Sequence, residues 1–489
     1  MSKLLWQGND WTFDTINNVY AACENIAVNE LNLNCYPNSL EVITTEQMLD
    51  AYTSVGMPIY YKHWSFGKHF VQEQRNYQSG RSGLAYELVI NSNPCINYLM
   101  EDNTMTTQAL VIAHAAFGHN HFFKNNYLFQ QWTDAGGIVD YLIFARDYID
   151  AQEVKHGRKA VEDWLDSCHA LMDYGVNRYK RPSKLSMEKE KARQKERGEY
   201  LQSQVSDLYR ILPKEKTKEN TANKFPAQPE ENLLYFFEKY SPDLEDWQRE
   251  ILRIVRKIAQ YFYPQGQTKV MNEGFASLVH YEIMNRLHTK GLTTDGSHLE
   301  FLALHTNVLY QPGHNSKYYS GINPYKFGFA MLQDITRMCD NPTEEDLHWF
   351  PQLKGANGWD VILDSVANFR DESFIRQWLS PKVIRDFKFF SVYDDREDIE
   401  KYLVTKIHND SGYEEVRTKL ADQYLRRSYV PQIEVINVDR KTRGLTLQYT
   451  STNNRTLGNT DKMMPHIKKL WSSYPVTIVD TKNSILSSM

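Results

Sequence analysis

Three histidines stand close together in the segment HAAFGHNHFF, at His114, His119 and His121. Imidazole nitrogens bind metal ions and transfer protons near neutral pH, so the cluster is a candidate for metal-dependent or acid–base chemistry. At about 100° per residue of α-helix, His114 and His121 lie nearly in phase, whereas His119 is rotated by about 140°. We therefore expect His119 to reach the same point only if the helix ends at Gly118. The alternative is one core histidine and two partly exposed ones.

A carboxylate and a histidine share one face of a second predicted helix, VMNEGFASLVHYEIMNRL at 270–287. Glu273 and His280 are seven residues apart and so lie two turns apart on the same side. Met284 and Leu287 continue this face, and an unpaired carboxylate is costly to bury among apolar side chains. The pattern predicts a metal ion or a hydrogen-bond network as partner. The alternative is that Glu273 begins the helix and complements its dipole.

The two segments together resemble the zinc-binding helices of gluzincin-type metallopeptidases. There, His-Glu-x-x-His and the glutamate of an Asn-Glu-Gly-Phe-Ala-type segment supply three ligands. Two histidines and one carboxylate form a recurrent catalytic zinc shell, and the same donors suit non-haem iron. This chain departs from the pattern, because position 118 is a glycine, the second histidine is His119, and Ala115 replaces the catalytic glutamate. The candidate replacements for this general base are Glu101, Glu87 and His121.

The elements that would position these residues are mainly helical, because apolar residues recur with helical spacing along most of the chain. The segment LAYELVI at 84–90 predicts a short buried strand. The main helices are expected at 12–32, 45–55, 104–117, 135–155, 157–178, 244–262, 270–287, 299–310 and 322–339.

The pattern becomes mixed after about residue 385. QIEVINVD and LTLQYTST have the composition of strands, and the turn between them at 440–444 predicts a hairpin. Helical stretches around 397–425 and 461–473 accompany these strands. We therefore predict a small α+β domain at the C-terminal end.

The length of 489 residues favours more than one structural unit. Residues 183–232 are dense in charge and have little to bury, which is typical of a solvated helix and loop or of a disordered excursion. We expect a mainly α-helical core domain with a few short strands, formed by residues 1–182 and 233–384. The charged excursion at 183–232 would interrupt it, and the α+β domain would occupy residues 385–489.

The overall composition limits the classes of partner and the cellular compartment that we expect for the protein. A net charge of −5 and a pI near 6.3 do not favour nucleic acid as a partner. Five scattered cysteines without a CxxC pair indicate free thiols in a reducing compartment. No stretch approaches the roughly 20 apolar residues of a membrane-spanning helix, and the N-terminus lacks the apolar core of a signal peptide. We therefore expect a cytoplasmic protein without membrane insertion.

Three blocks of the chain, AYELVIN…FFKNN (85–126), WQREILR…HYEIM (247–284) and INPYKFG (322–328), resemble the stage V sporulation protein R (SpoVR) family. The His-x4-His and Asn-Glu-Gly-x-Ala-x3-His blocks of the family correspond here to the candidate metal ligands His114, His119, Glu273 and His280. A further block contains His305, which the resemblance makes a fourth ligand or a hydrogen-bond partner of a ligand. His121 stands where some members carry a carboxylate.

The resemblance also implies a biological setting. Members in spore formers are linked to formation of the spore cortex. Members in non-sporulating proteobacteria tend to be encoded beside a PrkA-type serine kinase and its operon partner, which implies a role in stationary-phase stress. Three functions remain open: a zinc-dependent hydrolase of an amide bond in a peptide or cell-wall precursor, a non-enzymatic regulatory or scaffold protein acting with the kinase system, and a non-haem iron oxidase.

Overall fold

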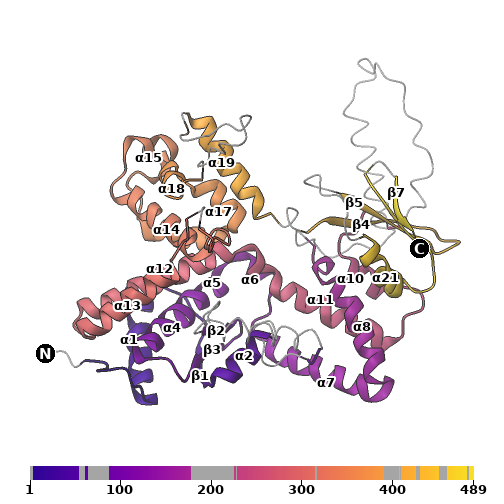
Figure 1. Cartoon of the computed structure of the whole chain (residues 1–489), viewed down its shortest axis with the longest axis horizontal. Helices are drawn as coiled ribbons and strands as arrows, with labels where there is room; N and C mark the ends of the chain where they lie inside the picture. The colour runs from indigo at the N-terminus through magenta and orange to yellow at the C-terminus, as the bar shows by residue number, and fades with distance from the viewer. Residues whose placement is uncertain are drawn as a thin grey trace. The chain divides into compact units, whose positions relative to one another are not determined.

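The described part of the chain is mainly helical and contains two small sheets, as the sequence predicts (Figure 1). Most of the charged excursion expected at 183–232 lies outside the described residues, as do the residues 397–406 of the helical stretch expected around 397–425. The computed structural model describes residues 4–53, 61–63, 87–177, 225–226, 228–313, 316–389, 407, 409–425, 430–450, 460–481 and 484–488.

Contacts divide the chain into two compact units, each built from two separate stretches. The first unit comprises Met1–Tyr148 and Phe262–Arg426. The second comprises Ile149–Tyr261 and Arg427–Met489. These divisions differ from the boundaries at 182 and 384 that composition suggests, because helices from the middle of the chain pack with a C-terminal helix.

The first unit holds every candidate site residue and consists mostly of helices. Helices α7 and α11 each contain a boundary between the units. In chain order the elements are α1 (Phe13–Asn29), β1 (Asn38–Ile43), α2 (Thr45–Thr53), β2 (Glu87–Ile90), β3 (Cys95–Met100), α4 (Met105–Val111), the π-helix η1 (Ile112–His119), α5 (Asn120–Asn125), α6 (Tyr127–Trp132), α7 (Ile138–His156), α11 (Asp246–Gln267), α12 (Lys269–Thr289), α13 (Asp295–Val308), α14 (Pro324–Asp340), α15 (Glu344–Trp349), η5 (Pro351–Leu353), α16 (Gly358–Asn368), α17 (Asp371–Trp378), α18 (Pro381–Asp386) and α19 (Asp410–Gln423).

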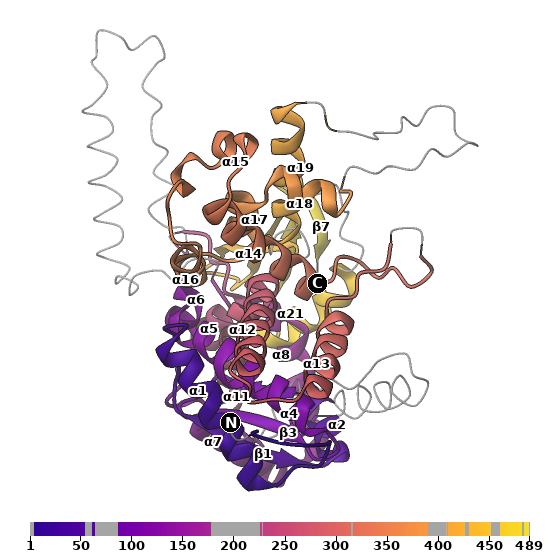
Figure 2. The same ribbon diagram turned by 90° about the vertical axis from the view of Figure 1, so that its left-hand side faces the viewer.

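A three-stranded sheet in this unit has the order β1-β3-β2. Its neighbouring strands β1 and β3 lie near the bottom of Figure 2. Strand β3 pairs in parallel with β1 and antiparallel with β2. The strand expected at 84–90 is confirmed over Glu87–Ile90, and Glu87 stands opposite Leu99 at the start of β2. The sheet therefore carries a carboxylate at the end of an otherwise apolar strand.

Helix α12 is held against η1 and α14 at points where the backbones nearly touch. A Cβ atom added to Gly274 of α12 would lie 2.5 Å from the Cα of Gly328 in α14. One added to Gly118 of η1 would lie 2.6 Å from the Cα of Ala276 in α12. No side chain fits at either contact, so glycine permits a spacing that fixes η1 and α14 relative to α12.

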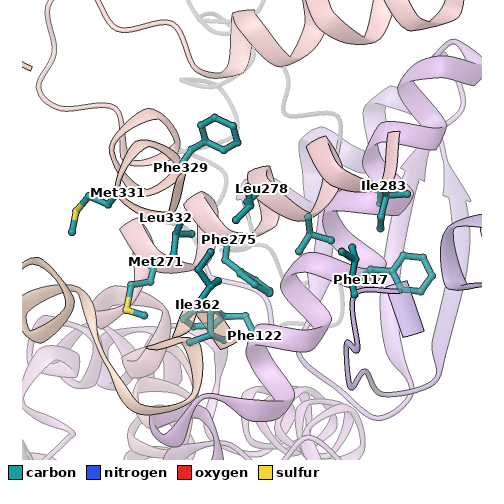
Figure 3. Close-up of a cluster of buried hydrophobic side chains, with 14 of the residues drawn as sticks. Phe117, Phe122, Met271, Phe275, Leu278, Ile283, Phe329, Met331, Leu332 and Ile362 are labelled. Carbon is teal, nitrogen blue, oxygen red and sulfur yellow. The ribbon is translucent and has the colours of Figure 1, made fainter. Parts of the chain in front are cut away.

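Apolar side chains from several helices fill the space around α12 (Figure 3). Phe275 of α12 faces Phe122 of α5, with ring centroids 6.4 Å apart. Phe117 of η1 and Ile362 of α16 are buried in the same cluster. Burying such aromatic and aliphatic side chains stabilises a fold by about 1.5–3 kcal/mol each, so this core anchors the helices that carry the site.

The second unit contains the predicted α+β fold, with a four-stranded sheet of order β4-β5-β6-β7. Strands β4 and β5 form the predicted antiparallel hairpin, and Phe236 of α10 stacks on Trp471 of α21 at 5.8 Å. This contact joins residues more than 230 apart in the sequence, which no local pattern indicates. The elements are α8 (Arg158–Ala170), η2 (Met172–Tyr174), α10 (Leu233–Tyr240), β4 (Gln432–Val438), β5 (Leu445–Thr450), α21 (Thr460–Trp471), β6 (Val476–Val479) and β7 (Ile485–Ser488).

Among the described residues, no helix combines the length and the apolar character needed to cross a bilayer.

Candidate metal centre

The histidine segment continues as a π-helix through Gly118 instead of ending there. The N–H of Asn120 donates to the carbonyl of Ala115, five residues earlier, as a π-helix requires. Because a π-helix holds more residues per turn than an α-helix, His114 and His119 come close to the same face, with ring centroids 4.6 Å apart. The expectation that a helix end is needed to bring these histidines together is therefore wrong.

Four side chains bring one donor atom each to a common point: His114, His119, Glu87 and Glu273. Nε2 of His114 lies 3.2 Å from Oε1 of Glu87 and 3.7 Å from Oε2 of Glu273. Nε2 of His119 lies 3.8 Å and 3.5 Å from the same two oxygens. Donors in a tetrahedral zinc site with bonds near 2.1 Å stand about 3.4 Å apart. The four donor positions therefore fit a metal ion of this size.

The burial of these donors favours a cation between them. The two histidine side chains are 3% and 5% exposed, while the carboxylates of Glu87 and Glu273 are 18% and 17% exposed. Nε2 of His114 and Oε2 of Glu273 are buried without a hydrogen-bond partner among the described residues. Each such atom costs about 1–3 kcal/mol, and a shared metal ion would remove that cost. The carboxylates are thus somewhat more exposed than the two histidines.

The charges of the group compensate one another. Burial opposes protonation of His119, but Glu273 and Glu87 together raise its pKa to about 9. Burial by itself would raise the pKa of Glu273, yet His119 and His114 outweigh it and lower that pKa. The two carboxylates thus create a negative potential that a metal ion would neutralise in place of a proton.

Hydrogen bonds to the other ring nitrogens orient the two histidines. Nδ1 of His119 lies 3.0 Å from Oδ1 of Asn272, and an amide oxygen can only accept, so Nδ1 carries the proton. Nε2 of His119 is then the nitrogen directed at the carboxylates, and it can bind a metal that displaces its proton. On His114, Nδ1 lies 2.8 Å from Nδ1 of His280. Partners of this kind fix ring orientation in metal sites.

His280 and His305, both predicted ligands, lie outside the donor group of the described residues. Both ring nitrogens of His280 are occupied, Nδ1 by His114 and Nε2 by Nδ1 of His305 at 2.7 Å. Burial lowers the pKa of His280 well below its usual value and that of His305 to about 4, so both rings are neutral. Seven residues of helix separate Glu273 from His280 by about 10 Å along the axis, too far for two ligands on one ion.

The predicted catalytic residues Glu101 and His121 also lie outside the donor group. Glu101 is exposed after β3, where its backbone carbonyl accepts a hydrogen bond from Trp11. Nδ1 of His121 accepts from the backbone N–H of Asn34 at 2.9 Å, and its ring packs on Phe275. Burial lowers the pKa of His121 to about 4. The third candidate base, Glu87, is the one that reaches the centre.

Asp371 is a supporting residue that the sequence pattern does not indicate. Its buried carboxylate accepts the backbone N–H groups of Val270 and Met271, each at 2.9 Å, at the start of α12. Burial outweighs these hydrogen bonds and raises the pKa of Asp371 to about 7. Because the carboxylate satisfies free N–H groups in the first turn of α12, it fixes the turn that carries Glu273. A distant aspartate capping another helix leaves no local signal in the sequence.

The fold and the site define a helical protein with a two-histidine, two-carboxylate candidate metal centre. Residues 10–429 match the family model of the SpoVR like proteins, and residues 431–483 match the SpoVR-like C-terminal domain. The chain therefore belongs to the SpoVR family, as its sequence blocks predict. It is 56% identical over 472 residues to the "Uncharacterized protein YcgB" of Escherichia coli (strain K12), an alignment that covers 96% of this chain and 92% of that protein. No solved structure matches the chain.

Proposed function

We propose that this protein is a metal-dependent hydrolase that cleaves an amide bond in a peptide or a cell-wall precursor. The observation that carries the proposal is the convergence of His114, His119, Glu273 and Glu87, whose donor atoms lie within 4.8 Å of one another. Zinc is the metal that best suits these nitrogen and oxygen donors at tetrahedral spacing, and iron is the alternative.

Three of the four residues would bind the metal, and the fourth would take part in the reaction. His114, His119 and Glu273 would hold the metal, since they come from two helices locked together at the contact between Gly118 and Ala276. A metal held there would polarise the carbonyl group of the substrate and lower the pKa of a bound water molecule. Oε1 of Glu87 would accept the proton of the attacking water and pass it to the leaving amine, the task that Ala115 cannot perform.

A structural metal centre is the second candidate. Oε1 of Glu87 is as close to the two histidines as Oε2 of Glu273 is, so Glu87 could equally complete a four-ligand shell. Such a shell leaves no position for water, and the protein would then act as a regulator or scaffold. In this second function the protein would act with the PrkA-type kinase and its operon partner, which the family resemblance implies. Both partners stay predictions, as do the sporulation and stress roles.

Loss of a ligand is expected to weaken zinc binding. Total binding of about 12 kcal/mol shared among four ligands gives roughly 3 kcal/mol each, so His114→Ala and Glu273→Ala are each expected to weaken zinc binding by about 100-fold or more. The measurement is titration of metal-stripped protein with Zn²⁺ against a chromogenic chelator. Elemental analysis of the anaerobically purified protein would distinguish zinc from iron.

The matched control is His348→Ala. His348 is 66% exposed and pairs with Asp410, away from the donor group. The His348→Ala protein should bind Zn²⁺ with the affinity of the unmodified protein. Full zinc content in both His114→Ala and Glu273→Ala would show that the proposed metal centre is wrong.

A further inference from the structure

Three imidazoles form one continuous chain of hydrogen bonds that begins at a proposed metal ligand. Nδ1 of His114 lies 2.8 Å from Nδ1 of His280, and Nε2 of His280 lies 2.7 Å from Nδ1 of His305. All three side chains are buried. The chain leads from η1 through α12 to α13, so its far end belongs to a helix that contributes no donor to the centre.

The atoms of the chain allow only one arrangement of protons when a metal is bound. Nε2 of His114 must be unprotonated to bind the metal, so its proton is on Nδ1 and is donated to Nδ1 of His280. His280 must then carry its own proton on Nε2 and donate it to Nδ1 of His305. The reverse arrangement would place a proton on Nε2 of His114, facing the metal. Each ring therefore dictates the tautomer of the next.

The surroundings of His305 support a fixed, neutral acceptor at the end of the chain. Aromatic rings pack around it, with centroids 5.0 Å away for Tyr281, 5.1 Å for Phe329 and 5.8 Å for Phe301. Burial lowers the pKa of His305 to about 4, so the ring is neutral at neutral pH and accepts at Nδ1 when its proton is on Nε2. An imidazole held by aromatic packing loses little further entropy when it accepts the hydrogen bond from His280.

We infer that His305 is a positioning residue that sets the tautomer of His114, acting through His280, and thereby sets the metal affinity of the centre. The inference rests on the proposed metal site and assigns a role to a residue two side chains away from it. It also gives a reason for an uninterrupted histidine chain, since imidazole can accept at one nitrogen and donate at the other.

The test compares two substitutions at one position. His305→Leu removes the acceptor and keeps an apolar side chain, whereas His305→Asn offers Oδ1 near the place of Nδ1. His305→Leu is expected to weaken Zn²⁺ binding by about 10–100-fold, and His305→Asn is expected to recover most of that loss. His298→Leu is the control, because His298 lies on the same helix and stacks on His288 instead, at 4.1 Å.

Nitrogen-15 NMR of histidine-labelled, metal-free protein reads the tautomer directly. The unmodified protein and His305→Asn should show a larger share of His114 protonated at Nδ1 than His305→Leu does, because Nε2 of His114 lies 3.2 Å from Oε1 of Glu87 and keeps the proton when the chain of acceptors is broken. Unchanged zinc affinity and an unchanged His114 tautomer in His305→Leu would overturn the inference. So would equal losses in both variants with the His114 tautomer intact, since His305 would then act through packing alone. If the unmodified protein binds no Zn²⁺, the proposed function fails, whereas the tautomer measurement still decides the role of His305.

Discussion

Replacing Glu87 with glutamine is expected to lower the rate of amide hydrolysis by about 10²–10⁴-fold while zinc remains bound. Glutamine has the shape of glutamate and can still accept a hydrogen bond, but it does not take up a proton at neutral pH. The proposed holding residues His114, His119 and Glu273 are untouched by the change. The substitution therefore separates proton transfer from metal binding at one position.

The measurement uses zinc-loaded protein with two probes, a casein-derived peptide mixture and purified stem-peptide fragments of peptidoglycan. Products are followed by mass spectrometry, and zinc content is determined on the same samples. Glu101→Gln is the control, because Glu101 is an exposed carboxylate outside the donor group and its loss should leave both readouts unchanged.

Two results for Glu87→Gln would contradict its assignment as the base. Loss of zinc would make Glu87 a fourth ligand and favour the closed centre of a regulatory or scaffold protein. Retention of zinc together with the full rate would exclude Glu87 from proton transfer. An unmodified, zinc-loaded protein that cleaves neither probe would count against hydrolysis of these two substrate classes.

Replacing Gly274 with alanine is expected to lower the free energy of unfolding by about 3 kcal/mol. The added Cβ would lie 2.5 Å from the Cα of Gly328 and 2.7 Å from the backbone nitrogen of Phe329. Both are backbone atoms, so no side-chain rotation relieves the overlap and the two helices must move apart. Because Glu273 is the neighbouring residue, zinc affinity should fall as well.

Urea denaturation of the metal-free protein measures the stability change, and Gly266→Ala is the control. Gly266 is exposed in α11, and a Cβ there would meet no atom within 4 Å. Alanine should therefore stabilise that helix by up to about 0.5–1 kcal/mol, the opposite sign. A Gly274→Ala protein as stable as the unmodified one would show that α12 and α14 are not held at this contact.

The helices and the C-terminal hairpin could be predicted because their signals are local. The spacing of apolar residues over 270–287 predicts α12, and the turn at 440–444 predicts the pairing of β4 with β5. The grouping of the chain into units was not predictable in this way. An apolar face on α10 indicates that something covers it, whereas its partner Trp471 is more than 230 residues away.

The candidate centre is likewise predictable from the sequence only in part. Residue type and spacing single out His114, His119 and Glu273, and the structure brings these three together. Glu87 appeared only as one of three replacements for a missing base, because a glutamate in a strand has no spacing that ties it to a distant helix. The family blocks predict His280 as a ligand and His305 as a fourth ligand or a hydrogen-bond partner of a ligand, because residue type does not distinguish a ligand from the residue that orients it.

The sequence by itself determined that this protein is mainly helical, that a small α+β domain ends it, and which histidines and carboxylates could meet. Only the tertiary structure decided how they meet. The phase argument assumes about 3.6 residues per turn and therefore separates His114 from His119, whereas the π-helix joins them. The π-helix lies in close contact with Ala276 at Gly118, over 150 residues apart along the chain, and such long-range packing leaves no trace in local periodicity.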